Sequence, residues 1–421
     1  MANSILTIDM ITRKSLEILE NNLVLTRNIN RQYDDSFAAQ GAKIGTTLRI
    51  RLPDRALVTD GAALQVQDDN EQFTTLAVSS QKHIGVNFTT AEMTMQLDDF
   101  AERVLKPRIS QLASSIDADV ANVYKSVYNS VGTPGTAPAT SLVLLQAQQK
   151  LNESAAPMSP RYATVNPAAN AGLVEGLKGF FNPTDTISRQ FKSGMMGTGV
   201  LGYDEINMSQ SIKTLTTGSR ATAATVTTTV ATEGQATLNI TGTGSQTLAV
   251  GDVFTIAAVN AVNPQTREST GSLQQFVVTA ANTASGGAYT SVAISPPLYT
   301  AAHALATVDA FPVASAVITF LGALSSQYPQ NLVYCKDAFT FATADLLLPQ
   351  GVDMASRQVH NGISLRIVRQ YDINNDRMPH RRAVWLRRHP PGDGLPYLRL
   401  ILTDTGPGVS RGQSTPIQKG Y

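Results

Sequence analysis

Residues 221–256 read ATAATVTTTVATEGQATLNITGTGSQTLAVGDVFTI and contain only two charged side chains, Glu233 and Asp252. The low charge extends from residue 214 to residue 330, where six charged side chains occur in 117 residues, against 59 in the other 304. Threonine, valine, alanine and glycine dominate this segment. Because the composition changes at both of its ends, we expect the segment to fold as a separate unit.

Short alternating runs inside the segment predict β-strands, and they read ATLNI, DVFTIAAV, LQQFVVTA and YTSVAI. Glycine and Asn-Pro turn signals separate these runs. Regular short strands with such turns indicate a small β-barrel or sandwich, which we assign to residues 212–330. Such a unit could help the chain to fold or could shape an outer surface, and the sequence leaves both roles open.

A long helix is predicted before the inserted segment, over residues 97–130. Its apolar side chains follow a helical period for about nine turns, which spans on the order of 50 Å. Pro107 is expected to kink it near its start. A helix of this length predicts an elongated subunit.

Residues 45–90 predict a long two-stranded hairpin. Its first strand alternates Leu48, Ile50 and Leu52 with arginines, and its second alternates Ile84, Val86 and Phe88 with Gly85 and Asn87. Arginines lie near the base of this hairpin and carboxylates toward its tip, and the two sets could pair between adjacent subunits. The arginines are Arg49, Arg51 and Arg55, and the carboxylates are Asp68, Asp69 and Glu71. Such a hairpin is marginal alone, so it packs on its own domain or reaches onto a neighbouring subunit.

The rest of the chain mixes helices with strands. Helices are predicted at 5–29, 141–152 and 168–181, and strands at 161–167, 362–373, 381–389 and 397–406. Residues 331–348 predict a strand followed by a helix. The sequence therefore indicates an α+β body that is interrupted by the inserted β-domain.

Composition and motifs argue against an enzyme. The net charge is +1, the single cysteine permits no intrachain disulfide, and the five histidines lack metal-binding spacing. The match of GTGVLG, residues 197–202, to a nucleotide-binding pattern lacks a preceding apolar strand, so a flexible loop is expected there. Paired carboxylates such as Asp98 and Asp99 are expected to cap helices or face solvent. We predict no catalytic residue, cofactor or metal.

No targeting or membrane segment is predicted. The start, MANSILTIDMITRKSLEIL, lacks the basic residues, apolar run and small-residue cleavage site of a signal peptide. No run of about 18 apolar residues occurs in the chain. We therefore expect the chain to be made in a cytoplasm and to lie outside membranes.

A basic cluster surrounds the only tryptophan, Trp385, in the run RMPHRRAVWLRRH. Its arginines are Arg377, Arg381, Arg382, Arg387 and Arg388. They make ordinary salt bridges on a partly exposed strand, or they form a basic surface for acidic partners, either another subunit's carboxylates or DNA phosphates. Nothing in the run would read base edges, so any contact with DNA would be non-specific.

The order of these parts resembles the major capsid protein of tailed bacteriophages, which has the HK-ninety-seven-type fold. The segment GDVFTIAAVNAVNPQTRESTGSLQQFVVTA, Gly251–Ala280, resembles the insertion domain of coat proteins from P-twenty-two-like phages. The resemblance divides the chain into an N-terminal arm (1–40), an E-loop hairpin (41–93), a P-domain with the spine helix (94–140 and 380–421), an A-domain (141–211 and 331–379) and the inserted β-barrel domain (212–330).

The resemblance implies a shell protein. Many copies would assemble as pentamers and hexamers into an icosahedral capsid around double-stranded DNA, with a scaffolding protein and a portal protein as partners. Assembly would take place in the bacterial cytoplasm and the product would be the virion capsid. Some members of the fold cross-link a lysine to an asparagine of a neighbour, but no motif here assigns such a pair.

Three other readings remain from the sequence. An encapsulin-like compartment shell shares the body fold but normally lacks a threonine-rich insertion. A decoration protein would be shorter, and a tail-tube protein would lack the long helix. A carbohydrate-active enzyme would need paired carboxylates in one cleft, and aromatic residues make up only 6% of the chain.

Overall fold

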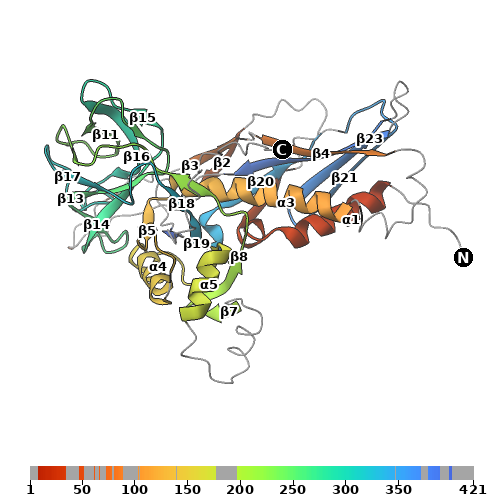
Figure 1. The fold of residues 1–421 in the computed structure, drawn as a ribbon, viewed down its shortest axis with the longest axis horizontal. Helices are drawn as coiled ribbons and strands as arrows, with labels where there is room; N and C mark the ends of the chain where they lie inside the picture. The colour runs from red at the N-terminus through yellow and green to blue at the C-terminus, as the bar shows by residue number, and fades with distance from the viewer. Residues whose placement is uncertain are drawn as a thin grey trace, which may run out of the picture.

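The computed structural model describes residues 8–34, 47–51, 61, 66, 73–77, 80–88, 103, 105–138, 140–176, 197–346, 348–370, 378–388 and 398–400. Figure 1 shows an elongated molecule in which helices α1 and α3 run along one long sheet. A β-barrel lies at one end of the long axis, and a smaller part with α4 and α5 projects from the same half of the body. No helix in the described ranges is long and apolar enough to cross a membrane.

The spine of the body is α3, Lys106–Ala121, which continues as the 3-10 helix η5, Asn122–Ser126. Residues 97–102 of the predicted long helix lie outside the described residues. Its predicted end at residue 130 is wrong, because residues 129–131 form the strand β5. Pro107 lies in the first turn of α3, a position that tolerates proline, and the predicted kink stays a prediction.

An apolar seam joins α3 to the N-terminal helix α1, Ile8–Asn22. Leucines of α1 and the following turn, including Leu16, Leu19 and Leu23, are buried in one cluster with Ile109 and Ile116 of α3. The short 3-10 helix η1, Thr26–Asn28, follows α1 and leads into the first strand. The predicted helix over residues 5–29 is thus confirmed for its central part.

The long sheet combines strands from both ends of the chain. Its order is β1 (Asn30–Asp34), β20 (Thr340–Ala344), β23 (Met378–Arg388), β22 (Ile363–Arg369) and β21 (Met354–His360), and β4 (Ser80–Phe88) pairs with the other side of β23. Only the β1–β20 pair is parallel. The strands predicted at 362–373 and 381–389 are confirmed.

The helix predicted in the second half of 331–348 is wrong. That half holds the one-turn helix η7, Lys336–Ala338, and then β20. β20 lies between β1 and β23, and Phe341, Ala342 and Thr343 are all buried. A strand covered on both faces has no alternation of apolar and polar residues, so its sequence is difficult to tell from that of a buried helix.

The two strands of the predicted hairpin are not partners of each other. β2, Thr47–Arg51, pairs with a strand that the sequence did not suggest, β3, Phe73–Ala77. The second predicted strand is β4, which pairs with β23 from Ser80 opposite Leu386 to Phe88 opposite Met378. This pairing attaches β4 to the long sheet of the same chain.

A second sheet forms the smaller α/β part. Its order is β5 (Asn129–Val131), β24 (Leu398–Leu400), β19 (Asn331–Cys335), β6 (Arg161–Val165), β8 (Tyr203–Met208) and β7 (Gly197–Val200). Helices α4, Leu142–Glu153, and α5, Pro167–Gly176, belong to the same part. Leu144, Leu173 and Ile206 lie in its apolar core.

The GTGVLG run forms a β-hairpin, so the flexible loop predicted there is wrong. Val200 pairs with Tyr203, so Leu201 and Gly202 form a two-residue turn between β7 and β8. Both turn residues have positive φ, 54° and 77°, as a tight hairpin turn requires. Gly202 therefore serves chain reversal, whereas Gly197 and Gly199 lie in β7.

Each of the two sheets combines strands from the segments predicted as the P- and A-domains, and that division stays a prediction. β20, β21 and β22 come from residues 331–379 yet lie in the long sheet with β23. β24 comes from residues 380–421 yet lies in the second sheet. Element order did not reveal this exchange because the pairing joins strands far apart in sequence.

The segment 212–330, predicted as the inserted domain, contains a closed antiparallel barrel. Its order is β10 (Ala224–Thr225), β17 (Val317–Phe320), β13 (Val253–Val262), β14 (Ser269–Val278), β16 (Ala288–Leu298) and β11 (Gln235–Thr241). A bridge between Val226 and Ile240 joins the last strand to the first. Phe254 and Phe276 stack in its core, with ring centroids 5.7 Å apart. The four strands predicted here are β11, β13, β14 and β16.

Candidate functional site

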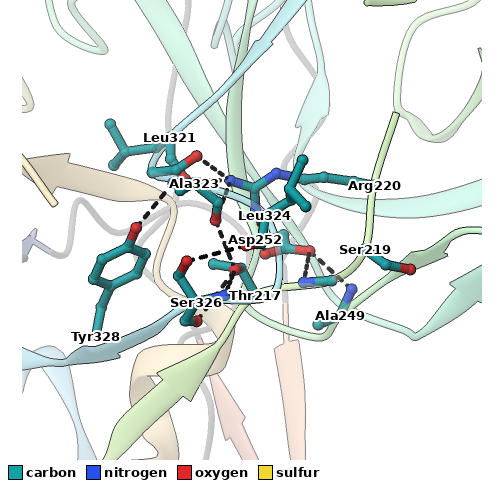
Figure 2. Close-up of polar contacts among 12 residues, drawn as sticks. Thr217, Ser219, Arg220, Ala249, Asp252, Leu321, Ala323, Leu324, Ser326 and Tyr328 are labelled. Atoms are coloured by element: carbon teal, nitrogen blue, oxygen red, sulfur yellow. Dashed lines mark hydrogen bonds and ion pairs between the residues drawn. The ribbon is translucent and has the colours of Figure 1, made fainter. Parts of the chain in front are cut away.

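The inserted domain is joined to the body by a two-stranded ribbon. Its strands are β9, Thr214–Thr216, on the entering side and β18, Gln327–Pro329, on the leaving side. Just beyond it, Thr217 N donates to the Ser326 carbonyl at 2.9 Å, and Ser326 N donates to Thr217 Oγ1 at 2.9 Å. Thr217 Oγ1 donates in turn to the Ala323 carbonyl at 2.8 Å, so one threonine ties both connecting strands (Figure 2).

A buried ion pair lies directly above this ribbon. Arg220 Nη1 is 2.7 Å from Asp252 Oδ1, and the two side chains are 3% and 0% exposed. Arg220 Nη2 also donates to the carbonyls of Leu321 at 2.7 Å and Gly322 at 2.5 Å (Figure 2). The guanidinium therefore holds the loop between β17 and β18 while it neutralises the carboxylate.

The second oxygen of Asp252 accepts two backbone hydrogen bonds. Asp252 Oδ2 accepts hydrogen bonds from Ala249 N at 2.8 Å and Gly218 N at 3.2 Å. Together, Arg220 and Asp252 join the segment just after β9, the loop between β17 and β18 and the turn before β13. We call this pair, together with Gly218 and the nearby Thr217 and Ser326, the base clamp.

Burial and charge act in opposite directions on this pair. Burial lowers the pKa of the Arg220 guanidinium, and the neighbouring Asp252 carboxylate opposes that shift. The guanidinium also lies 5.0 Å from the centroid of the Phe320 ring. A complete buried pair contributes little net stability, but the loss of one partner leaves an unpaired buried charge, which costs about 3–5 kcal/mol. Loss of either Arg220 or Asp252 alone should therefore destabilise the base clamp.

Glycines permit close approach around the clamp. A Cβ atom at Gly218 would overlap the carbonyl oxygen of Thr247. Gly251 has a φ of +97°, and a Cβ there would lie 3.3 Å from the Tyr124 ring of η5. The barrel therefore rests closely on the end of the spine.

A second contact joins barrel and body away from the clamp. Gln275 of β14 and Ser130 of β5 exchange two hydrogen bonds, from Ser130 N to Gln275 Oε1 at 2.7 Å and from Gln275 Nε2 to the Ser130 carbonyl at 2.9 Å. Beside it lies a cavity of about 120 Å³ between the end of α4 and the barrel. Lys150 and Glu153 line its body side, and Pro297 and Tyr299 line its barrel side.

The described residues contain no group of three or more side chains arranged to hold a metal ion. The base of the inserted domain is instead built from buried hydrogen bonds and one ion pair, which position two folded parts. This arrangement suits a protein whose surfaces must keep a fixed relative orientation.

The comparison with protein families decides which kind of structural protein this is. The model of the family described as "P22 coat protein - gene protein 5" matches residues 1–389. The chain belongs to the P22 coat protein family. As a member it is a major capsid protein that forms the shell of the virion, and its role is structural. The encapsulin, decoration, tail and enzyme readings are not favoured.

Solved phage structures are similar over most of the chain. "Mycobacterium phage Che8" has 10% identity and a TM-score of 0.44, covering 90% of each chain. "Capsid of Ralstonia phage GP4" has 10% identity and a TM-score of 0.39, covering 97% of this chain and 96% of that one. The "CUS-3 coat protein I-domain" has 34% identity and a TM-score of 0.19, covering 24% of this chain and 98% of that one. No curated protein matches. The assignment rests on the family match.

The predicted hairpin charges of this coat protein are only partly described. Arg49 and Arg51 lie on β2, opposite Thr75 and Phe73. Arg55, Asp68, Asp69 and Glu71 lie outside the described residues. The predicted pairing of arginines with carboxylates of an adjacent subunit therefore stays a prediction.

The basic cluster lies mostly on one central strand. Arg381 and Arg382 of β23 are opposite Val368 and Ile367 of β22, and Arg387 and Arg388 are opposite Ala342 and Phe341 of β20. Arg377 lies outside the described residues. β23 therefore has a paired strand on each side, and its backbone is not an open edge of the sheet.

Sequence reasoning missed the base clamp. Arg220 and Asp252 are separated by 32 residues, and no local pattern links them. A signal was nevertheless present, because they are two of only six charges in 117 residues. In such a segment, a basic and an acidic residue with apolar neighbours are candidates for a buried pair.

Proposed function

We propose that this coat protein assembles as pentamers and hexamers into an icosahedral shell that encloses double-stranded DNA. The family match over residues 1–389 carries this proposal. The elongated body supports it, because a long subunit with a spine helix and a long sheet offers several separate contact surfaces. Many weak contacts per subunit would hold the shell and still let misplaced subunits dissociate.

We also propose two protein partners, an internal scaffolding protein and a portal protein at one vertex. The resemblance to tailed-phage coat proteins supports both. Assembly would take place in the bacterial cytoplasm, where the single cysteine, Cys335, stays reduced; it is buried and free in this structure. The chain would catalyse no reaction.

We propose a role for the basic cluster on β23 as a non-specific contact to an acidic partner, either DNA phosphates or carboxylates of a neighbouring subunit. Four of its five arginines share one strand. A phosphate contact would weaken steeply as salt increases, because counterions are released on binding. A protein contact of the same cluster would be insensitive to added DNA, which separates the two partners.

Sedimentation velocity of the purified chain tests the proposal. The chain is measured alone and with the scaffolding protein encoded by the same phage. We expect a slow species alone and large, uniform particles in the mixture. A monomer that persists in the mixture at high concentration would contradict the assembly proposal.

A further inference from the structure

The second sheet of the body has an open side at β5. In the described part of the chain, β24 is the only strand that pairs with β5, in parallel register from Asn129 opposite Leu398 to Val131 opposite Leu400. The opposite side of β5 faces the inserted barrel, since Gln275 of β14 reaches Ser130 there. An unpaired strand edge of this kind is a template for pairing with another chain.

Gln275 closes this edge with a side chain in place of a strand. Its carboxamide has one acceptor and two donor hydrogens, so it can bind as a backbone amide unit does. It accepts from Ser130 N at 2.7 Å and donates to the Ser130 carbonyl at 2.9 Å. These are the two bonds that a neighbouring strand would make with Ser130.

The two bonds satisfy the outward hydrogen-bonding groups at the centre of β5. In a strand, the N–H and C=O of one residue point to one side, and those of the next residue point to the other. Asn129 and Val131 therefore face β24 when Ser130 faces the barrel. Ser130 is 4% exposed, so its backbone groups are shielded from bulk water while Gln275 is in place.

We propose that the inserted domain protects the β5 edge from strand addition by a second copy of this chain, and that Gln275 is the residue that blocks it. A coat protein meets copies of itself more often than any other chain, so the same edge on another copy is the strand most available to pair. The block is built into the fold because the base clamp holds β14 in place against β5. The proposal concerns mispairing before assembly, and it does not depend on the symmetry of the shell.

Amide hydrogen exchange of the wild-type chain gives a first test that needs no variant. The Ser130 amide should exchange as slowly as the amides of Asn129 and Val131, which face β24. Rapid exchange at Ser130 beside slow exchange at its neighbours would overturn the proposal, because Gln275 would then not occupy the edge.

Variants of the full chain give the second test. Gln275→Met keeps the length of the side chain and removes both hydrogen bonds. Gln265→Ala removes a glutamine from the exposed tip between β13 and β14, and Ile294→Val loosens the barrel core without touching β5. We expect Gln275→Met to speed exchange at Ser130 at least tenfold and to aggregate at concentrations where both controls stay clear.

The aggregate itself identifies the partner. If second copies add at the β5 edge, residues 129–131 should be protected again from exchange within the Gln275→Met aggregate. Exchange or aggregation no faster than in Ile294→Val would overturn the proposal. So would an aggregate in which residues 129–131 stay unprotected, because the chains would then be joined elsewhere.

Discussion

Asp117 of α3 and Thr26 of η1 are joined by two hydrogen bonds, from Thr26 Oγ1 to Asp117 Oδ1 at 2.6 Å and from Thr26 N to the same oxygen at 3.1 Å. The other carboxylate oxygen accepts from Val24 N at 2.7 Å. Asp117 is 2% exposed. A side chain of the spine helix thus caps the turn that follows α1 and fixes the N-terminal segment on the body.

Asp117→Ala should lower the free energy of unfolding by about 2–3 kcal/mol, because it leaves buried backbone N–H groups without acceptors. Asp337→Ala serves as the control, since Asp337 is an exposed residue with one side-chain hydrogen bond from Asn30. Urea denaturation of the unassembled chain measures both variants. Equal losses in the two would contradict the capping role of Asp117.

Arg220→Met and Asp252→Leu should each cost about 3–5 kcal/mol, because each leaves one buried charge unpaired. The double variant should lose clearly less than the two single losses combined, since it buries no charge. Circular dichroism during urea denaturation measures this cycle, and Glu233→Ala, at an exposed position, is the control. Additive losses would show that the two side chains do not act as a pair.

Gly218→Ala should destabilise the inserted domain by about 1–3 kcal/mol, because the new methyl group overlaps the Thr247 carbonyl and the backbone must shift. Gly85→Ala is a matched control, since nothing lies within 4 Å of a Cβ atom at that position. Thermal denaturation of both variants measures the difference. A Gly218→Ala protein as stable as Gly85→Ala would contradict the close approach described at the base.

The lowered pKa of Glu20 implies that the stability contributed by its contacts depends on pH. Burial acts to raise its pKa, but hydrogen bonds from Asn361 and Arg31 and the charges of Arg31 and His360 outweigh it, so the net pKa is lowered. A lowered folded-state pKa gives stability that is present above the unfolded pKa, about 4.3, and is lost as the pH falls through the folded pKa.

Glu20→Gln should therefore be less stable than the wild type at pH 7 by up to about 1 kcal/mol, since the site is partly exposed. The difference should shrink at pH 3, because the wild-type carboxyl gains protons as the pH falls toward its lowered folded-state pKa. Urea denaturation at the two pH values measures it. A difference that is larger at pH 3 would contradict the sign of the pKa shift.

Reversal of the three predicted tip charges, Asp68→Lys, Asp69→Lys and Glu71→Lys, should impair assembly and leave the folded subunit intact. Each exposed pair contributes about 0–1 kcal/mol, but the contact repeats in every subunit. Light scattering follows assembly, and circular dichroism checks the fold. Normal assembly of the triple variant would show that these charges do not hold subunits together.

The parts that the sequence predicts well have regular local patterns. Residue types alternate along DVFTIAAV and LQQFVVTA, so the sequence could place β13 and β14 before any strand pairing was known. β20 could not, because Phe341 to Thr343 are buried on both faces and lack alternation. Which strands pair with each other is harder to predict than where the strands lie. That β4 pairs with β23, across some 300 residues, depends on which edges remain after the core has formed.

The functional contacts depend on the same long-range geometry. Arg220 and Asp252 could be noted as rare charges, but only the closed barrel brings them within 2.7 Å. Gln275 is one of several glutamines, and nothing in its neighbourhood marks it as the partner of Ser130. Local periodicity specified the elements, whereas the contacts at the base arise from how those elements pack.

Cryo-electron microscopy of particles formed by the purified chain and its scaffolding protein tests the central claim most directly. We predict closed icosahedral shells built of pentamers and hexamers, in which each subunit shows a separate barrel attached at the base clamp. Particles without closed symmetry, or a chain that stays monomeric under every condition, would contradict the account.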